Sequence, residues 1–231
     1  MRSIGIIGTA KNTGKTTTLS VILNSLRKKK VAVTGIGYDG EEIDNVTMLP
    51  KPRLYFDKSI IVATAEKCIV NSEVEYKLIK KTDIETSLGN VCIVEVTKPG
   101  LIVIAGPNRA SQLKELILII KDLGRDYLLV DGSLNRISPM YLLDDLIFTT
   151  GGSRSTDISI LADEMSTVEK IFSFPLSSYK GDNYSAVTFI TDSGIIPADI
   201  KTFIDADDVK TLTESVPSEC KQILLPVFFS E

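Results

Sequence analysis

The feature that most constrains the fold is a glycine-rich segment close to the N-terminus, which lies between a short apolar run and an amphipathic run. The apolar run, residues 4–8, is typical of a buried strand, and from 15 to 30 apolar residues recur at helical spacing. A strand that turns through glycines into a helix places backbone N–H groups where they can hold an anion. The sequence therefore predicts a phosphate-binding loop, which reads Gly8-Thr9-Ala10-Lys11-Asn12-Thr13-Gly14-Lys15-Thr16-Thr17.

The residue types in this segment match the chemistry of nucleoside triphosphate binding. Small residues let backbone N–H groups point at phosphate oxygens, a lysine reaches the β- and γ-phosphates, and a hydroxyl contacts Mg²⁺. We expect Lys15 to be catalytic by stabilising charge on those oxygens, and Thr16 to hold the metal. ATP and Mg²⁺ are the predicted cofactors. The predicted nucleotide contacts are Gly8, Lys11, Asn12, Thr13, Gly14, Lys15, Thr16 and Thr17.

The spacing of the loop departs from the regular pattern, because Thr9 stands where a glycine is usual and Gly8 comes one place earlier. In this respect the loop resembles that of dethiobiotin synthetases and cobyrinic acid a,c-diamide synthases. Those enzymes belong to the group of P-loop proteins that includes the MinD, ParA and nitrogenase-iron-protein ATPases. The signature second lysine of that group would fall on Ala10, and here the basic residue is the neighbouring Lys11. The resemblance makes a homodimer a candidate assembly.

Two carboxylates are candidates for the metal and for the reaction. Asp131 ends an apolar run and can hold Mg²⁺ directly or through water, although Asp-Gly at a strand end is also common as a turn. Asp39 follows the β-rich run 31–37, at the sheet edge where open α/β sheets bind ligands. We predict it as a second metal contact and as a catalytic residue that positions water; a solvated acidic loop is the alternative. No Asn-Lys-x-Asp segment occurs, which favours ATP over GTP.

The strand and helix patterns predict an α/β fold, the P-loop NTPase three-layer fold, with a mainly parallel sheet. Residues 4–37 form a βαβ unit whose two strands should be parallel. We expect a single domain over 1–231 with a β-rich insert at about 40–105, in which 91–105 form a hairpin. The other predicted elements are helices at about 109–123 and 155–165, and strands at 127–132, 145–149, 168–173 and 186–191.

Composition excludes several classes of function. The chain has no histidine, which removes imidazole bases, Ser-His triads and most zinc enzymes. Its three cysteines are far apart, which argues against a disulfide framework or a structural zinc site. Its net charge is −4, so we predict neither nucleic acid nor an anionic membrane as a partner. The N-terminus does not read as a signal peptide, and no apolar run approaches the roughly 20 residues of a membrane span. We therefore expect a cytoplasmic protein.

A closer resemblance extends over most of the chain. It is carried by four segments: Gly35–Asp44, Val46–Arg53, Ala63–Cys68 and Val130–Arg136. Together they resemble the smaller subunit of the lysine 5,6-aminomutase reactivase of amino-acid-fermenting bacteria. The resemblance implies a partner, a MutS-like ATPase subunit, and a client, an adenosylcobalamin-dependent aminomutase. It also implies that ATP hydrolysis drives the release of damaged cobalamin.

Two other functions remain open at this point. One is an ATP-dependent ligase of the dethiobiotin-synthetase type, which would phosphorylate a carboxylate substrate held by Lys51, Arg53 and Lys67. The other is a nucleotide-sensing module without meaningful turnover. The enzymatic activity that we expect for this protein is ATP hydrolysis.

Overall fold

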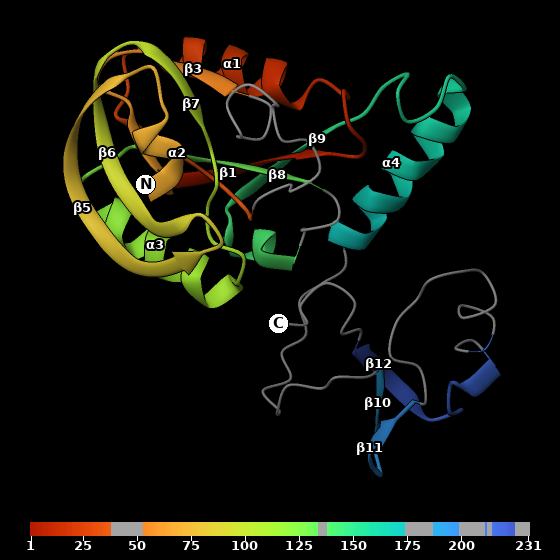
Figure 1. Ribbon diagram of the computed structural model, residues 1–231. Coiled ribbons are helices and arrows are strands. Elements are labelled where there is room, and N and C mark those ends of the chain that lie inside the picture. Colours follow the sequence, from red (N-terminus) through yellow and green to blue (C-terminus); the bar gives the residue numbers. More distant parts are fainter. Residues whose placement is uncertain (38–52, 134–137, 174–186, 199–210, 212–213, 225–231) are drawn as a thin grey trace. The chain divides into compact units, whose positions relative to one another are not determined.

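The computed structural model describes most of the chain, in two compact units. The units are Met1–Glu164 and Met165–Glu231. The prediction that the whole chain is a single domain stays a prediction. The described residues are 1–37, 53–133, 138–173, 187–198, 211 and 214–224 (Figure 1).

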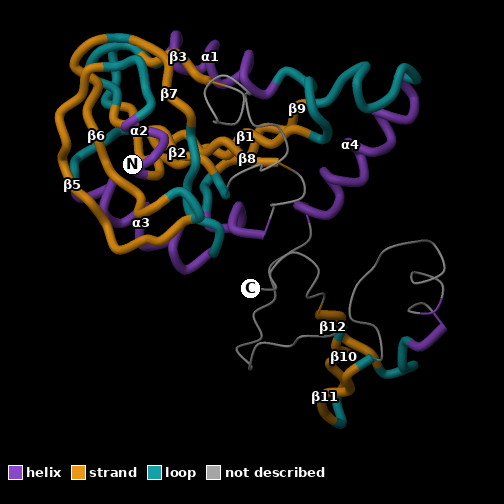
Figure 2. Tube along the Cα trace, viewed as in Figure 1, coloured by secondary structure: helices purple, strands orange, loops and turns teal. Residues whose placement is uncertain are grey.

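The first unit is built on a seven-stranded sheet with the strand order β5-β6-β4-β2-β8-β1-β9 (Figure 2). Five neighbouring strands are parallel, and two antiparallel strands extend the sheet on one side. The predicted α/β fold with a mainly parallel sheet is confirmed. The parallel strands are β1 (Arg2–Gly8), β2 (Val31–Gly35), β4 (Ile61–Ala65), β8 (Tyr127–Ser133) and β9 (Asp145–Thr149), and the antiparallel ones are β5 (Glu75–Thr86) and β6 (Gly89–Lys98).

Both faces of the sheet are covered, which gives three layers. Neighbouring residues of one strand enter different cores, since Ile6 packs with the helix α1 (Lys15–Ser25) and Ile7 packs in a second cluster. That second cluster contains the buried face of the helix α3 (Ala110–Asp122). Figure 1 shows α1 and α3 on opposite sides of the sheet. Strands buried on both faces explain the continuous apolar runs of the sequence.

The β-rich insert is present, but its strand pairing differs from the prediction. Residues 91–105 do not form a hairpin, because β6 pairs with β4 and β5, whereas β7 (Gly100–Val103) pairs with β3 (Arg53–Phe56). With a partner on each side, β6 has no free edge for the strand that follows it. Gly100 lets the chain pass close to another backbone, since a Cβ there would lie 2.8 Å from the carbonyl of Glu73.

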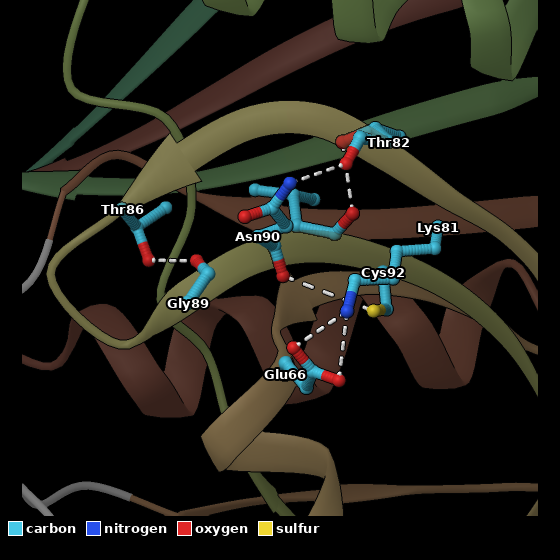
Figure 3. A network of polar contacts seen from close by, with 8 residues as sticks. Glu66, Lys81, Thr82, Thr86, Gly89, Asn90 and Cys92 are labelled. Carbon is cyan, nitrogen blue, oxygen red and sulfur yellow. Dashed lines mark hydrogen bonds and ion pairs between the residues drawn. The ribbon is translucent and has the colours of Figure 1, made fainter.

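The hairpin that does form joins β5 to β6, and polar contacts fix it in place (Figure 3). At its turn, the Thr86 hydroxyl donates to the carbonyl of Gly89 at 2.6 Å, and the Asn90 amide donates to the carbonyl of Thr82 at 2.9 Å. Lys81 Nζ contacts both carboxylate oxygens of Glu66 at 3.0 and 2.9 Å. Because Glu66 begins the helix α2 (Glu66–Val70), this ion pair ties the hairpin to the helix.

Toward the C-terminus, one helix replaces a predicted helix and a predicted strand. The helix α4 (Ile158–Ser173) includes residues 168–173, so the predicted strand there is wrong. Ile158, Leu161, Met165 and Val168 lie three or four residues apart, and this helical spacing outweighs the local β-propensity. The other predicted elements, including the strand near 186–191, have counterparts. The remaining elements are η2 (Ser138–Leu142) and a three-stranded antiparallel sheet of β10 (Thr188–Thr191), β11 (Gly194–Pro197) and β12 (Cys220–Leu224).

The segment after β7 packs tightly against the end of β2. The Gly37 amide donates to the carbonyl of Pro107 at 2.9 Å, and the Gly106 amide donates to the carbonyl of Gly37 at 3.3 Å. A Cβ on Gly106 would lie 1.9 Å from the carbonyl oxygen of Gly35. No side chain can be accommodated at Gly106 unless one of the two backbones moves.

Gly106→Ala is therefore expected to lower the free energy of unfolding by about 3 kcal/mol, at the upper end of the cost of overpacking. Urea denaturation measures the change. Gly152→Ala is the matched control, because a Cβ at Gly152 has no other atom within 4 Å. Equal stability of the two variants would contradict the close approach of these segments.

Candidate functional site

The connection from β1 to α1 has the backbone geometry that an anion site requires. Gly14 is the N-cap of α1, with φ 88° in the left-handed region, and Asn12 also has a positive φ of 60°. Gly14 provides no side-chain cap for the amides at the helix start. The first N–H groups of a helix have no partner within the helix, and the helix dipole favours an anion at that end. This strand–loop–helix unit has the arrangement of the phosphate-binding loop in P-loop proteins.

The shifted glycine is explained by the way the loop closes on itself. The Thr13 hydroxyl donates to the carbonyl of Ala10 at 2.9 Å. A Cβ on Gly8 would lie 2.9 Å from this hydroxyl and 3.3 Å from that carbonyl. The close approach therefore occurs at Gly8, whereas Thr9 has room for its side chain. The Thr9 hydroxyl instead donates to the Thr150 hydroxyl at 2.9 Å.

Residues at the end of β9 and just after it form hydrogen bonds with the loop, and none of them is among the predicted site residues. The Thr9 amide donates to the carbonyl of Thr149 at 3.0 Å, and the Thr149 hydroxyl donates to the carbonyl of Ile7 at 3.3 Å. The Ser153 hydroxyl donates to the carbonyl of Asn12 at 2.9 Å. The only signal in the sequence is a run of small polar residues after a strand, Thr149-Thr150-Gly151-Gly152-Ser153.

The sheet brings Lys15 and Asp131 together at its carboxyl edge. Asp131 is aligned with Ile6 of β1 on one side and with Gly35 of β2 on the other. Lys15 Nζ lies 3.5 Å from Asp131 Oδ1, and the two side chains are only 21% and 17% exposed. Lys15 and Asp131, 116 positions apart in the sequence, thus form a half-buried ion pair.

The donor set around this pair suits Mg²⁺. The Asp131 carboxylate and the half-buried Thr16 hydroxyl are oxygen ligands, the type that Mg²⁺ prefers. Within the described part of the chain, no group of three or more His, Cys, Asp or Glu residues could hold a metal by itself. Mg²⁺ commonly takes one or two protein oxygens and completes its coordination with phosphate oxygens and water. The predicted metal contacts Thr16 and Asp131 fit that pattern.

The other predicted site residues are placed less closely or lie outside the described residues. Lys11, Asn12 and Thr17 belong to the loop or the first turn of α1 and are exposed. Asp39, predicted as a catalytic and metal-binding residue, lies outside the described residues.

Of the three cations assigned to a carboxylate substrate, two lie among the described residues. Arg53 Nη1 lies 2.7 Å from Glu73 Oε1, so this guanidinium already has a carboxylate partner. Lys67 is exposed on α2, and Lys51 lies outside the described residues. The described residues therefore do not show the cationic pocket that the ligase hypothesis needs.

The three cysteines are free thiols. Cys68 and Cys92 are buried, and burial raises the pKa of the Cys68 thiol to about 11. A thiol with so high a pKa is a poor nucleophile near neutral pH, because little of it is ionised. Cys68 therefore acts as a small core residue.

Comparisons with known proteins do not assign the chain to a family. No protein-family model matches it, and no curated protein matches it. Among solved structures, the chain is similar to pNOB8 ParA bound to nonspecific DNA, with 17% identity and a TM-score of 0.34. The match covers 92% of this chain and 72% of that chain. Among the described residues, no helix is long and apolar enough to cross a membrane.

Proposed function

We propose that this protein binds Mg-ATP on the loop from Gly8 to Thr17 and hydrolyses it slowly. The observation that carries the proposal is the half-buried pair of Lys15 and Asp131 beside a loop with two left-handed residues. A lysine and a carboxylate held together at a helix N-terminus can supply a cation for phosphate and an oxygen ligand for Mg²⁺. The absence of an Asn-Lys-x-Asp segment favours ATP over GTP.

Each residue of the site has one role in binding or hydrolysing the nucleotide. Amides of the loop and of the first turn of α1 donate to phosphate oxygens, and the Lys15 ammonium moves from Asp131 to the β- and γ-phosphates. Thr16 and Asp131 would hold Mg²⁺, which would neutralise charge on the phosphate oxygens. Asp39 orients the attacking water. The pair places the phosphate-binding cation and a ligand for Mg²⁺ within 3.5 Å of each other.

We further propose that hydrolysis serves a reactivating factor for an adenosylcobalamin-dependent aminomutase, together with a MutS-like ATPase partner. The sequence resemblance around Gly35–Arg53 and Ala63–Cys68 supports this assignment. A nucleotide that binds one conformation of a complex more tightly than another can shift its equilibrium and so expel a tightly held cofactor. A chain with a phosphate loop, no histidine and no clear small-substrate motif suits such a switch better than it suits a metabolite enzyme.

A ligase of the dethiobiotin-synthetase type is the second candidate, and the Gly8-Thr9 spacing of the loop favours it. The ion pair of Arg53 with Glu73 weighs against it. An ATPase assay with and without the partner proteins, beside a screen of small carboxylates, distinguishes the two. Phosphate release that depends on a carboxylate would identify a ligase, and release that depends on protein partners would identify the switch. Nucleotide binding without either would identify a sensing module.

Asp131→Asn is expected to raise the Mg²⁺ concentration needed for half-maximal hydrolysis about ten-fold, and more than Asp39→Asn does. Asparagine keeps the size of the side chain but removes the charge that faces the metal. Mg²⁺ titrations of the hydrolysis rate measure both variants. Asp122→Asn removes the same charge at the exposed end of α3 and is the control. A normal titration for Asp131→Asn would show that Asp131 does not hold the metal.

A further inference from the structure

One contact between the β9–α4 connection and the loop lies at the peptide that follows Asn12. The Ser153 hydroxyl donates to the carbonyl of Asn12 at 2.9 Å, across 141 positions of sequence. Asn12 has a φ of 60°, a conformation that residues other than glycine adopt at some cost in energy. Such a conformation persists where the surroundings hold it. The Ser153 side chain comes from outside the loop and holds this conformation of Asn12.

This contact determines which way one backbone N–H group points. In a trans peptide, the carbonyl of one residue and the N–H of the next point in opposite directions. Because the Asn12 carbonyl is directed to Ser153, the Thr13 amide is directed away from Ser153. The Thr13 hydroxyl holds the Ala10 carbonyl at 2.9 Å in the same manner, which fixes the direction of the Lys11 amide. Successive amides held in this way form an anion-binding concavity.

We propose that Ser153 is a positioning residue for phosphate: it holds the peptide between Asn12 and Thr13 with its N–H turned toward the nucleotide. The proposal rests on the proposed function of the same loop. Ser153 does not need to touch the nucleotide, because it acts through the Asn12 carbonyl. Its loss frees one peptide to rotate, and the bound nucleotide must then bear the cost of ordering that peptide.

The position of Ser153 also links the loop to α4. The next residue, Arg154, contacts Glu164 of α4 with two nitrogens, at 2.7 and 3.1 Å. The Arg154 amide donates to the carbonyl of Gly151 at 2.8 Å, which closes a turn around Ser153. By thermodynamic reciprocity, a nucleotide that stabilises the Asn12 peptide also stabilises the turn that holds Ser153. Nucleotide should therefore slow amide exchange in residues 151–160.

The test compares Ser153→Ala, Ser153→Thr and a matched control, Ser25→Ala. Ser25 also donates to a backbone carbonyl at 2.9 Å and is exposed, but its acceptor is Val21, within α1 and away from the loop. The loss of one neutral hydrogen bond predicts about five-fold weaker Mg-ATP binding for Ser153→Ala in titration calorimetry. Threonine keeps the hydroxyl and should restore the affinity, and Ser25→Ala should bind as the wild type does.

Hydrogen exchange supplies the readout that a merely structural role would not change. In the wild-type protein, Mg-ATP should slow exchange across residues 151–160, and in Ser153→Ala this protection should be lost while α3 keeps its own exchange rates. Wild-type affinity and wild-type protection in Ser153→Ala would overturn the proposal and leave the function of the loop standing. If the wild-type protein itself binds no Mg-ATP, the proposed function and this inference fail together.

Discussion

Lys15→Ala is expected to lower Mg-ATP hydrolysis by about 100-fold or more, the loss that follows when one well-placed donor to a reacting oxygen is removed. The lysine is 21% exposed and lies outside the two main cores, so the fold should survive the change. The substitution also removes the ion-pair partner of Asp131, which stands 3.5 Å away. Binding and hydrolysis should therefore weaken together.

Calorimetric titration with Mg-ATP and a phosphate-release assay measure the two quantities, and the circular dichroism spectrum reports the fold. Lys28→Ala is the matched control, because it removes the same charge from an exposed position beyond the C-terminal end of α1. The assignment of the loop is wrong if Lys15→Ala binds Mg-ATP with unchanged affinity.

The parts of the fold that depend on local patterns were predictable. Apolar spacing and glycines in the segment from Ile4 to Gly35 predict a strand, a loop, a helix and a second strand, and the structure has all of them. The apolar spacing over 15–30 predicts a helix that extends to 30, whereas α1 ends at Ser25. Helix ends depend on cap geometry, which apolar spacing does not determine.

The parts that depend on contacts between distant residues were not predictable. The partner of β7 is β3, and no local pattern distinguishes β3 from the neighbouring β6. Thr149 and Ser153 contact the loop across more than 130 residues, and a Thr–Gly–Ser run alone is typical of any turn. The Asp131 prediction had a better basis, because a carboxylate near the C-terminal end of a buried parallel strand lies toward the carboxyl edge of the sheet, where the loop also lies.

The largest functional effect is expected in a reconstituted system. An adenosylcobalamin-dependent aminomutase that its own substrate has inactivated should recover activity when this protein, the MutS-like partner, Mg-ATP and fresh cofactor are added together. Without ATP, little recovery is expected, because a tightly held cofactor dissociates slowly. Nucleotide turnover by the pure protein should be slow and should rise in the complete mixture.

The control for this experiment replaces the wild-type chain with the Lys15→Ala variant. If reactivation depends on the nucleotide cycle of this subunit, the variant should give no recovery above that of the partner alone. Equal recovery with Lys15→Ala would show that the partner supplies all of the useful hydrolysis. No recovery with every component present would remove the reactivase assignment, and the nucleotide-binding loop would then have to be assigned to another client. Equal recovery with Lys15→Ala and no recovery with the wild-type chain test different properties. The first tests the nucleotide cycle, because Lys15 acts on phosphate, and the second tests recognition of the client, which must involve other surfaces of the chain.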